Sequence, residues 1–372
     1  MAPSNFIQSC FEPGVLKDDT ENAALRWSRG RLEQVPNCPA CGSGKRRGLP
    51  LGCTDRRTDL RDDTWHLSRC GACRSLYLDP RPDGESLPRA YEVYYTHEEA
   101  NDASVPQAGI SGLVGRLIHG YLNHRFGMTR QAASRWGVAV FCALPPLRQK
   151  LDYYGRHLYL SDFPRRGRLL DVGCGNGAFL ARAAEMGWQV NGLDPDPAAV
   201  AVCTGQNLRV VQGALRDAPA EWAGQFDVVT MSHSIEHVTD PRMELKRVFS
   251  LLRAGGVLWL ACPNPDSLGS RVYAQAWRGL HPPYHLVIPS APQLSRLLLD
   301  AGFEHPVPVR RGSHARWMMQ ESAENARHAG GVAMRTRAWL APLFRVLADL
   351  AASAVPGGAE ETVIMARRPA QP

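Results

Sequence analysis

The chain has 372 residues, which is more than one typical domain needs and enough to bury a large hydrophobic core. With 44% hydrophobic and 21% charged residues, its composition excludes a disordered or fibrous protein. The formal charge of +7 and the pI near 9.0 admit anionic partners such as nucleic acid, phosphorylated substrates or membrane surfaces. Because much of this excess comes from arginines spread along the chain, general solubility is the simpler explanation.

Neither a membrane span nor a secretion signal is expected. No run of residues reaches the roughly 18 apolar positions that a membrane-spanning helix needs. Residues 1–10 have neither a basic start nor a continuous apolar stretch, so we do not expect a signal peptide. These features predict a cytoplasmic protein.

Two short cysteine pairs lie near the N-terminus, Cys38 with Cys41 and Cys70 with Cys73. A Cys-x-x-Cys turn aims two thiolates at one point, and four thiolates match the tetrahedral ligand set of structural zinc. The long gap between the pairs predicts an inserted hairpin or loop over residues 42–69, where Cys53 or His66 could replace one ligand. Four protein ligands leave no position for a substrate, so we expect the zinc to stabilise a small module.

Residues 98–165 contain two apolar stretches. In the first, apolar side chains recur at helical spacing from Leu113 to Phe126. The second, from Trp136 to Leu144, is too short to cross a bilayer and stops at two prolines. We expect these residues to form a helical cap over the cleft of the domain that follows.

A glycine-rich loop is the most informative feature of the chain. A buried-strand pattern from residue 168 leads into Gly173, Gly175 and Gly177, and a helix pattern follows over residues 179–186. Glycine carries no Cβ that would hold the backbone away from a ligand, and it tolerates the positive φ of a tight turn. The sequence therefore predicts a loop that binds a nucleotide cofactor.

The next strand supports this interpretation. It is expected over Trp188 to Leu193 and ends on Asp194, an acid placed where such folds hydrogen-bond a ribose diol. The run from Gly173 to Ala178 also satisfies the relaxed fingerprint of NAD and FAD sites, so the loop alone does not identify the cofactor.

Strand and helix patterns alternate regularly between residues 167 and 264. Strands are expected near residues 168, 188, 208, 226 and 256, with helices between them. This alternation is typical of an α/β fold with a doubly wound, Rossmann-like parallel sheet. A further helix is expected over residues 290–301, a sixth strand over 306–311 and a last strand over 361–366.

Four motifs occur in the order found in class I S-adenosylmethionine-dependent methyltransferases. Leu170 to Gly177 and Gly192 to Pro195 resemble the first two motifs of that family. Phe226 to Pro241 and Leu252 to Leu260 are similar to its fourth and fifth strands with their loops. The paired cysteines and the following residues resemble an N-terminal zinc segment found before many bacterial methyltransferases of small-molecule and polysaccharide pathways. The resemblance covers most of residues 36–302 and implies S-adenosylmethionine as methyl donor.

The resemblance also implies the residues that bind the donor. The glycines of the loop would approach its methionine part, Asp194 would bind its ribose hydroxyls, and Asp171 would order the loop. The adenine would be held by three residues after the third strand, Gly213, Ala214 and Leu215. Ser232, at the end of strand four, belongs to the same expected site.

A polar loop follows strand four, Ser232-His233-Ser234-Ile235-Glu236-His237. His237 is the first candidate for a general base, because a neutral imidazole accepts a proton near neutral pH. An equally open role for His237 or His233 is to pack against the donor and hydrogen-bond the backbone. Glu236 could orient the base or help to bind a divalent ion, as in the ubiquinone-type O-methyltransferases that this loop resembles.

A second group of polar side chains follows strand five, within residues 277–285. We expect its candidate catalytic residues at the mouth of the same site: His281, Tyr284 and His285. The segment resembles the substrate-side loop of the family, and its two prolines suggest either a shaped acceptor wall or a loop anchor. Tyr94 and Tyr95 could join this wall from the N-terminal module.

Residues 315–357 depart from the compact family pattern and predict a mostly helical insertion. Within it, residues 335–354 carry an apolar stripe with arginines nearby: Trp339, Leu340, Leu343, Phe344, Leu347 and Leu350. A helix of this kind packs on the body of the protein or on a second subunit. Alternatively, it rests on anionic lipid as an interfacial helix, which would suit a lipid-linked glycan substrate.

The expected organisation has five parts: a zinc module in residues 1–97, a helical cap in 98–165, a methyltransferase core in 166–314, the insertion in 315–357 and a last core strand with tail in 358–372. The leading hypothesis is methyl transfer to a hydroxyl, or secondarily a carbon, of a sugar, glycan or other small metabolite. A ribosomal or transfer RNA methyltransferase is the runner-up, since some of these also have an N-terminal zinc knuckle. A non-catalytic binding protein is a third hypothesis. The sequence does not indicate an oligomeric state.

Overall fold

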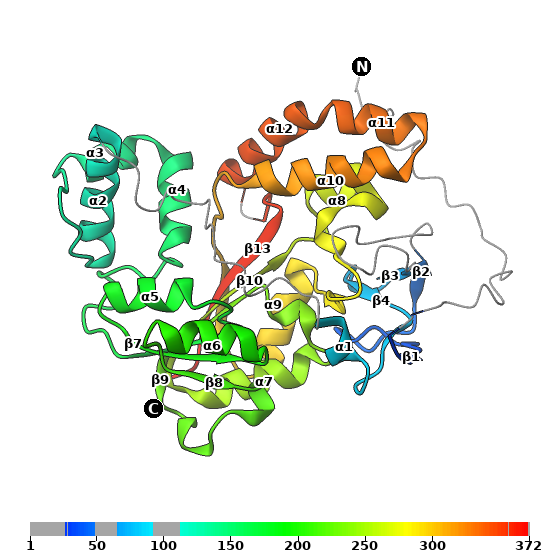
Figure 1. Cartoon of the computed structure of the whole chain (residues 1–372), viewed down its shortest axis with the longest axis horizontal. Helices are drawn as coiled ribbons and strands as arrows, with labels where there is room; N and C mark the ends of the chain where they lie inside the picture. Colours follow the sequence, from blue (N-terminus) through cyan, green and yellow to red (C-terminus); the bar gives the residue numbers. More distant parts are fainter. Residues whose placement is uncertain (1–26, 28, 49–64, 92–111, 356, 371–372) are drawn as a thin grey trace, which may run out of the picture.

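The computed structural model of the chain describes residues 27, 29–48, 65–91, 112–355 and 357–370. Its centre is a seven-stranded sheet in the order β12-β13-β10-β9-β6-β7-β8 (Figure 1). The strands are β6 (Arg168–Val172), β7 (Gln189–Asp194), β8 (Val210–Gln212), β9 (Phe226–Ser232), β10 (Leu252–Pro263), β12 (Glu304–Pro308) and β13 (Glu361–Arg367). Strands β6 to β10 are parallel, whereas β13 is antiparallel to both of its neighbours. The expected doubly wound α/β sheet is confirmed.

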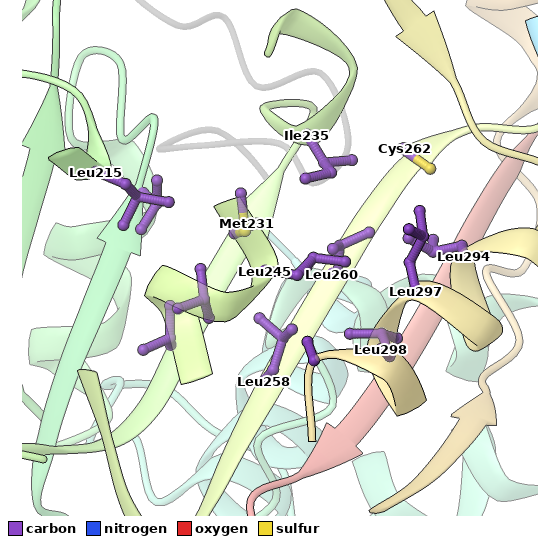
Figure 2. Close-up of a cluster of buried hydrophobic side chains, with 14 of the residues drawn as sticks. Leu215, Met231, Ile235, Leu245, Leu258, Leu260, Cys262, Leu294, Leu297 and Leu298 are labelled. Atoms are coloured by element: carbon purple, nitrogen blue, oxygen red, sulfur yellow. The ribbon is translucent and has the colours of Figure 1, made fainter. Parts of the chain in front are cut away.

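Helices cover both faces of this sheet because alternate strand residues point to opposite sides. The covering helices are α5 (Ala178–Glu185), α6 (Pro197–Gly205), α7 (Pro241–Leu251) and α9 (Ala291–Asp300). Leu169 and Val228 pack in one core with residues of α5 and α6. Their neighbours Leu170 and Val229 pack on the other face, with α7 and α9. Figure 2 shows part of this second core, where Leu245 faces Leu258 and Leu260 of β10.

The expected helices of residues 98–165 are present in their described part. They are α2 (Leu113–Phe126), α3 (Gly137–Ala143) and α4 (Pro145–Tyr154), with Pro145 in the first turn of α4. Figure 1 places them together beside α5. They share a core with Phe179 of α5 and with Cys174 of the glycine loop. These helices therefore border the glycine loop from the side of α5.

The N-terminal module is joined to the core by a shared sheet. Its elements are β1 (Leu32–Glu33), β2 (Arg46–Gly48), β3 (Leu67–Cys70), β4 (Leu76–Leu78), β5 (Arg81–Pro82) and α1 (Leu87–Tyr91). A strand that follows β10 in the chain, β11 (Val287–Ile288), completes a four-stranded sheet in the order β11-β4-β3-β2. The Ser290 hydroxyl donates a hydrogen bond to the Cys73 carbonyl oxygen at 2.7 Å. The module and the core thus fold against each other.

The insertion consists of α10 (Ala315–Ala329), α11 (Val332–Trp339) and α12 (Ala341–Ala354), which lie above α8 (Leu268–Tyr273) in Figure 1. The mostly helical prediction agrees with this, but a continuous helix over residues 335–354 is wrong. Helix α11 ends at Trp339, and α12 begins at Ala341. Pro342 lies in the first turn of α12, where the missing N–H of proline is tolerated. In the described part of the chain, every helix is too short or too polar to span a bilayer.

Candidate functional site

The glycine loop joins β6 to α5 in a tight turn. All three glycines have positive φ: 71° at Gly173, 53° at Gly175 and 78° at Gly177. A Cβ on Gly177 would lie 2.6 Å from a methyl of Leu208, closer than side chains approach each other. A Cβ on Gly173 would lie 2.9 Å from Cβ of Ser234, in the polar loop after β9. The turn therefore needs glycine, and it brings the loop against the polar loop.

Asp194, at the end of β7, is tied to this loop. One carboxylate oxygen accepts the backbone N–H of Gly175 at 2.8 Å, and the other accepts that of Asp196 at 3.0 Å. Asp194 is buried, and burial raises the pKa of its carboxyl group. The next strand end is adjacent, because the Gly213 N–H donates to the Asp194 carbonyl oxygen at 2.9 Å. Gly213, Ala214 and Leu215 follow β8, and Leu215 is buried in the core of Figure 2.

Asp171 lies within β6, beneath the glycine loop, and is buried. It forms an ion pair with Arg156 and accepts a hydrogen bond from the Thr230 hydroxyl at 2.7 Å. The guanidinium of Arg156 stacks on Phe179 at 3.5 Å from the ring centre. Burial raises the pKa of Asp171, although the nearby guanidinium favours its charged form. Through Arg156, Asp171 of β6 is thus linked to Phe179 of α5 and to the segment that follows α4.

The polar loop after β9 contains a chain of charges in which the carboxylates are buried and His233 is partly exposed. His233 lies 3.1 Å from Glu236 through one ring nitrogen and 3.1 Å from Glu361 of β13 through the other. Glu361 also pairs with Arg311. Burial opposes the charge on His233, but the two carboxylates outweigh it and raise the pKa of His233 to about 10. A pKa of about 10 favours the protonated form of His233 at neutral pH, and that form does not accept a proton.

Glu236, His237 and His285 converge at the end of this loop. Each offers one ligand atom, and these atoms lie within 4.8 Å of one another. Burial lowers the pKa of His237, and it lowers the pKa of His285 well below its usual range. Although burial opposes its charge, His233 lowers the pKa of Glu236. The group therefore combines two neutral imidazoles with an ionised carboxylate.

The chemistry of this group fits a divalent cation. His285 Nδ1 lies 2.8 Å from the carbonyl oxygen of Gly279, to which it donates when neutral, so its Nε2 carries the lone pair. That Nε2 lies 3.9 Å from Oε1 of Glu236. Oε2 of Glu236 is buried and has no hydrogen-bond partner among the described residues. Nitrogen and oxygen donors of this kind suit a divalent transition metal.

The acceptor-side residues meet at the same place. The ring centres of His281 and Tyr284 are 4.8 Å apart, and those of His281 and His285 are 5.0 Å apart. The His237 and His285 rings lie 4.9 Å apart, so the segment after β10 and the polar loop form one cluster. The Leu286 N–H donates to the Glu236 carbonyl oxygen at 2.8 Å and fixes this arrangement. Tyr94 and Tyr95 lie outside the described residues.

Four thiols converge in the N-terminal module. The sulfur atoms of Cys38 and Cys73 are 3.7 Å apart, and those of Cys41 and Cys70 are 3.5 Å apart. A tetrahedron with zinc-sulfur bonds of about 2.3 Å has edges of about 3.8 Å, close to both distances. The backbone N–H of Cys73 also points at the sulfur of Cys70, at 3.4 Å. Cys53 lies outside the described residues, and His66 lies outside the four-thiol cluster.

Three residues of the site were not identified from the sequence. Tyr91, at the end of α1, places its hydroxyl 2.8 Å from Nδ1 of His237. Arg156 pairs with Asp171, and Glu361 pairs with His233. The tyrosines of residues 91–95 signalled an aromatic contribution from the N-terminal module. No local signal marked Arg156 or Glu361, because their partners are distant in the sequence.

The core is similar to known proteins. Residues 147–305 match a family model described as a methyltransferase domain. A ubiquinone biosynthesis O-methyltransferase of Xanthomonas axonopodis pv. citri (strain 306) is 37% identical over 128 residues, 33% of this chain and 51% of that protein. The corresponding protein of Xanthomonas campestris pv. campestris (strain B100) is 37% identical over 129 residues, with the same coverage. The chain thus spans about half the length of the curated relatives it matches.

Solved structures with a similar fold include a SAM-dependent methyltransferase from Archaeoglobus fulgidus, with a TM-score of 0.39, 20% identity and coverage of 62% of this chain and 99% of that chain. A second is the 1,6-didemethyltoxoflavin-N1-methyltransferase of Burkholderia thailandensis, with a TM-score of 0.37, 16% identity and coverage of 71% and 92%.

Proposed function

We propose that this chain, whose residues 147–305 match a methyltransferase domain, is a class I S-adenosylmethionine-dependent methyltransferase that transfers the donor's methyl group to a hydroxyl of a small acceptor molecule. The observation that carries the proposal is the position of His237, a neutral imidazole beside an ionised Glu236 in the loop that touches the glycine loop. The curated relatives are named as O-methyltransferases, which supports oxygen as the acceptor atom.

The donor site is assigned to the carboxyl ends of the parallel strands. The glycine loop and Asp171 would hold the methionine part, and Asp194 the ribose hydroxyls. The adenine would lie against Gly213 to Leu215, and Ser232 would complete the site. When bound, the donor supplies an electrophilic methyl group on a sulfonium, so the protein contributes mainly alignment and proton transfer.

His237 is assigned as the general base. If its Nδ1–H donates to the Tyr91 oxygen at 2.8 Å, Nε2 keeps the lone pair that accepts the proton of the acceptor hydroxyl. The imidazolium that forms lies next to the Glu236 carboxylate, which stabilises its charge. His285, Tyr284 and His281 would line the acceptor pocket. In this assignment His233 is a fixed cation that keeps Glu236 ionised.

A divalent ion at Glu236, His237 and His285 is the alternative use of the same group. Such an ion would polarise an acceptor hydroxyl as a Lewis acid. A ring nitrogen that ligates a metal has no lone pair left for a proton. The base role and the ligand role of one nitrogen of His237 therefore exclude each other, and metal analysis separates them.

The four thiolates of the N-terminal module are assigned to one structural zinc ion. Their likeness to the zinc segment of bacterial small-molecule and polysaccharide methyltransferases favours a sugar or glycan acceptor. No disulfide links the eight cysteines of the described residues, which suits the proposed cytoplasmic location. Nucleic acid remains the second acceptor class to be tested, because the chain is basic.

The proposal is tested by calorimetric titration with S-adenosylmethionine, followed by transfer of its labelled methyl group to panels of sugars, nucleotide sugars, phenols and RNA. His237→Gln should reduce turnover by a factor of about 10² to 10⁴ while donor affinity is kept. The matched control is His328→Gln, at an exposed position on α10, which should leave turnover unchanged. Lack of donor binding by the folded protein would favour a non-catalytic scaffold, and selective methylation of RNA would favour the second acceptor class.

A further inference from the structure

Helix α12 has apolar side chains on two opposite faces. Its inner face packs on the body of the protein. Ala348 and Ala352 are buried there, and the ring of Phe344 lies 6.3 Å from that of Tyr273. This inner face attaches the helix to the body of the protein. A surface helix with one such face would normally be polar on the other.

The outer face of α12 is apolar instead, and its side chains are larger. We call the α11–α12 apolar face the following residues, with their exposed fractions: Trp339 (79%), Leu343 (53%), Val346 (48%), Leu347 (44%) and Leu350 (60%). The four residues of α12 follow the spacing i, i+3, i+4 and i+7, so they form one continuous stripe. An exposed apolar stripe of this size marks an interaction surface.

The exposed charge beside this face is positive. Arg335 of α11 is exposed and lies one helical turn before Trp339, whereas Arg345 of α12 lies on the side of the buried Ala348. The single acid in residues 331–355 is Asp349, whose carboxylate accepts the backbone N–H groups of His314 and Ala315 at 2.8 and 3.0 Å. Asp349 is therefore directed at the start of α10. Within α11 and α12, the α11–α12 apolar face is left with Arg335 as its charged neighbour.

We propose that the α11–α12 apolar face binds the surface of a bilayer that contains anionic lipids. Apolar side chains enter the region between headgroups and acyl chains, Trp339 lies at headgroup level, and Arg335 meets lipid phosphates. With 14 residues, α12 is about 21 Å long, which is shorter than the hydrocarbon core of about 30 Å. The helix therefore lies along the membrane surface.

Charge favours this occupant over a second copy of the chain. A two-fold symmetric interface places the same patch on both partners. Arg335 would then lie against an identical basic patch, without an acid of that patch to compensate it. An anionic lipid surface supplies the opposite charge.

The position of this face next to the acceptor side gives it a functional setting. Helix α10, which packs with α11 and α12, also contacts the segment before His281. The Arg278 N–H donates to the Ser322 hydroxyl at 2.9 Å, and the Asn325 amide donates to the Ala276 carbonyl oxygen at 3.4 Å. The inference itself concerns binding alone and does not depend on methyl transfer.

The test is co-sedimentation of the full chain with phosphatidylcholine vesicles, with and without phosphatidylglycerol. Binding is expected only to the anionic vesicles and should weaken as salt is added. Leu343→Ser with Leu347→Ser should weaken binding about a hundredfold. Arg335→Gln should weaken it about fivefold.

The matched control is Leu113→Ser with Val114→Ser on α2, where the side chains are 68% and 58% exposed, as on the α11–α12 apolar face. This variant should bind the vesicles as the wild type does. Equal losses in both serine variants, or no wild-type binding to anionic vesicles, would overturn the proposal. So would a dimer in solution that the Leu343→Ser and Leu347→Ser variant converts to a monomer, since a second copy would then cover the face. Donor titration of each variant verifies its fold and shows separately whether the proposed function holds.

Discussion

Asp194→Ala should uncouple the donor from the glycine loop. In the structure the carboxylate accepts two backbone N–H groups, from Gly175 at 2.8 Å and from Asp196 at 3.0 Å. Each oxygen retains a lone pair, and these are assigned to the ribose hydroxyls. The substitution thus removes the ribose acceptors and also releases the N–H that fixes the middle of the loop.

The size of the effect follows from the bonds that are lost. A hydrogen bond to a charged group contributes about 1.5 to 3 kcal/mol. The loss of one such bond to the ribose corresponds to a roughly tenfold to hundredfold weaker donor affinity. Asp194→Asn keeps one acceptor oxygen but loses the charge and should fall between the wild type and Asp194→Ala.

Calorimetric titration with S-adenosylhomocysteine measures this effect. The matched control is Asp227→Ala, at the opposite end of the parallel strands. Asp227 also accepts a backbone N–H, from Arg168 at 2.7 Å, and an arginine N–H, from Arg253 at 2.6 Å. It should lose stability without losing donor affinity. Unchanged affinity in Asp194→Ala, or an equal loss in Asp227→Ala, would refute the ribose assignment.

Two further predictions concern the zinc module and the charged loop. Cys70→Ser should abolish the binding of about one zinc ion per chain and lower the melting temperature, because metal binding contributes to folding. Metal analysis measures the zinc content and calorimetry the melting temperature. If zinc content and melting temperature both stayed at the wild-type level, the zinc assignment would be wrong. His233 has a folded pKa of about 10 against an ordinary value of 6.5, so its contribution to stability is full below about pH 6.5 and is lost as the pH rises towards 10. Denaturant titrations of the wild type and of His233→Gln should therefore differ most below pH 6.5 and converge towards pH 10, and a constant difference would show that His233 does not titrate in this range.

The sequence predicted the elements whose signals are local. The glycine loop, the strand before it and Asp194 lie within about 30 consecutive residues of one βαβ unit, whose order is characteristic. Its three glycines adopt the positive φ that the loop needs, at 71°, 53° and 78°. The sixth strand was misplaced by a few residues: it runs over Glu304–Pro308 instead of 306–311, since strand ends depend on pairing with β13.

The extent of the zinc module was not predictable from local patterns. A boundary at residue 97 followed from the cysteine spacing, but β11, more than 200 residues later in the chain, pairs with β4 of the same small sheet. A strand of two residues carries too weak a pattern to be recognised alone. Pairing with a distant segment identifies it.

For the polar loop after β9, residue type and protonation were separate questions. The sequence favoured His237 as the base over His233, but it gave no charge state for either ring. Glu361 lies 128 residues from His233 and, with Glu236, keeps it charged. His237 meets the Tyr91 hydroxyl, 146 residues away, and is kept neutral by burial. Tertiary contacts thus gave two similar imidazoles different charges.

The sequence by itself determined the parallel α/β sheet, the cofactor loop with its acid and the paired cysteines, because periodicity and short spacings act over a few residues. Only the tertiary structure decided which side chains meet at the acceptor side, which histidine is neutral and where the helices of the insertion leave an apolar face. These properties depend on burial and on charges brought together from distant segments, and a pattern along the chain does not contain those distances.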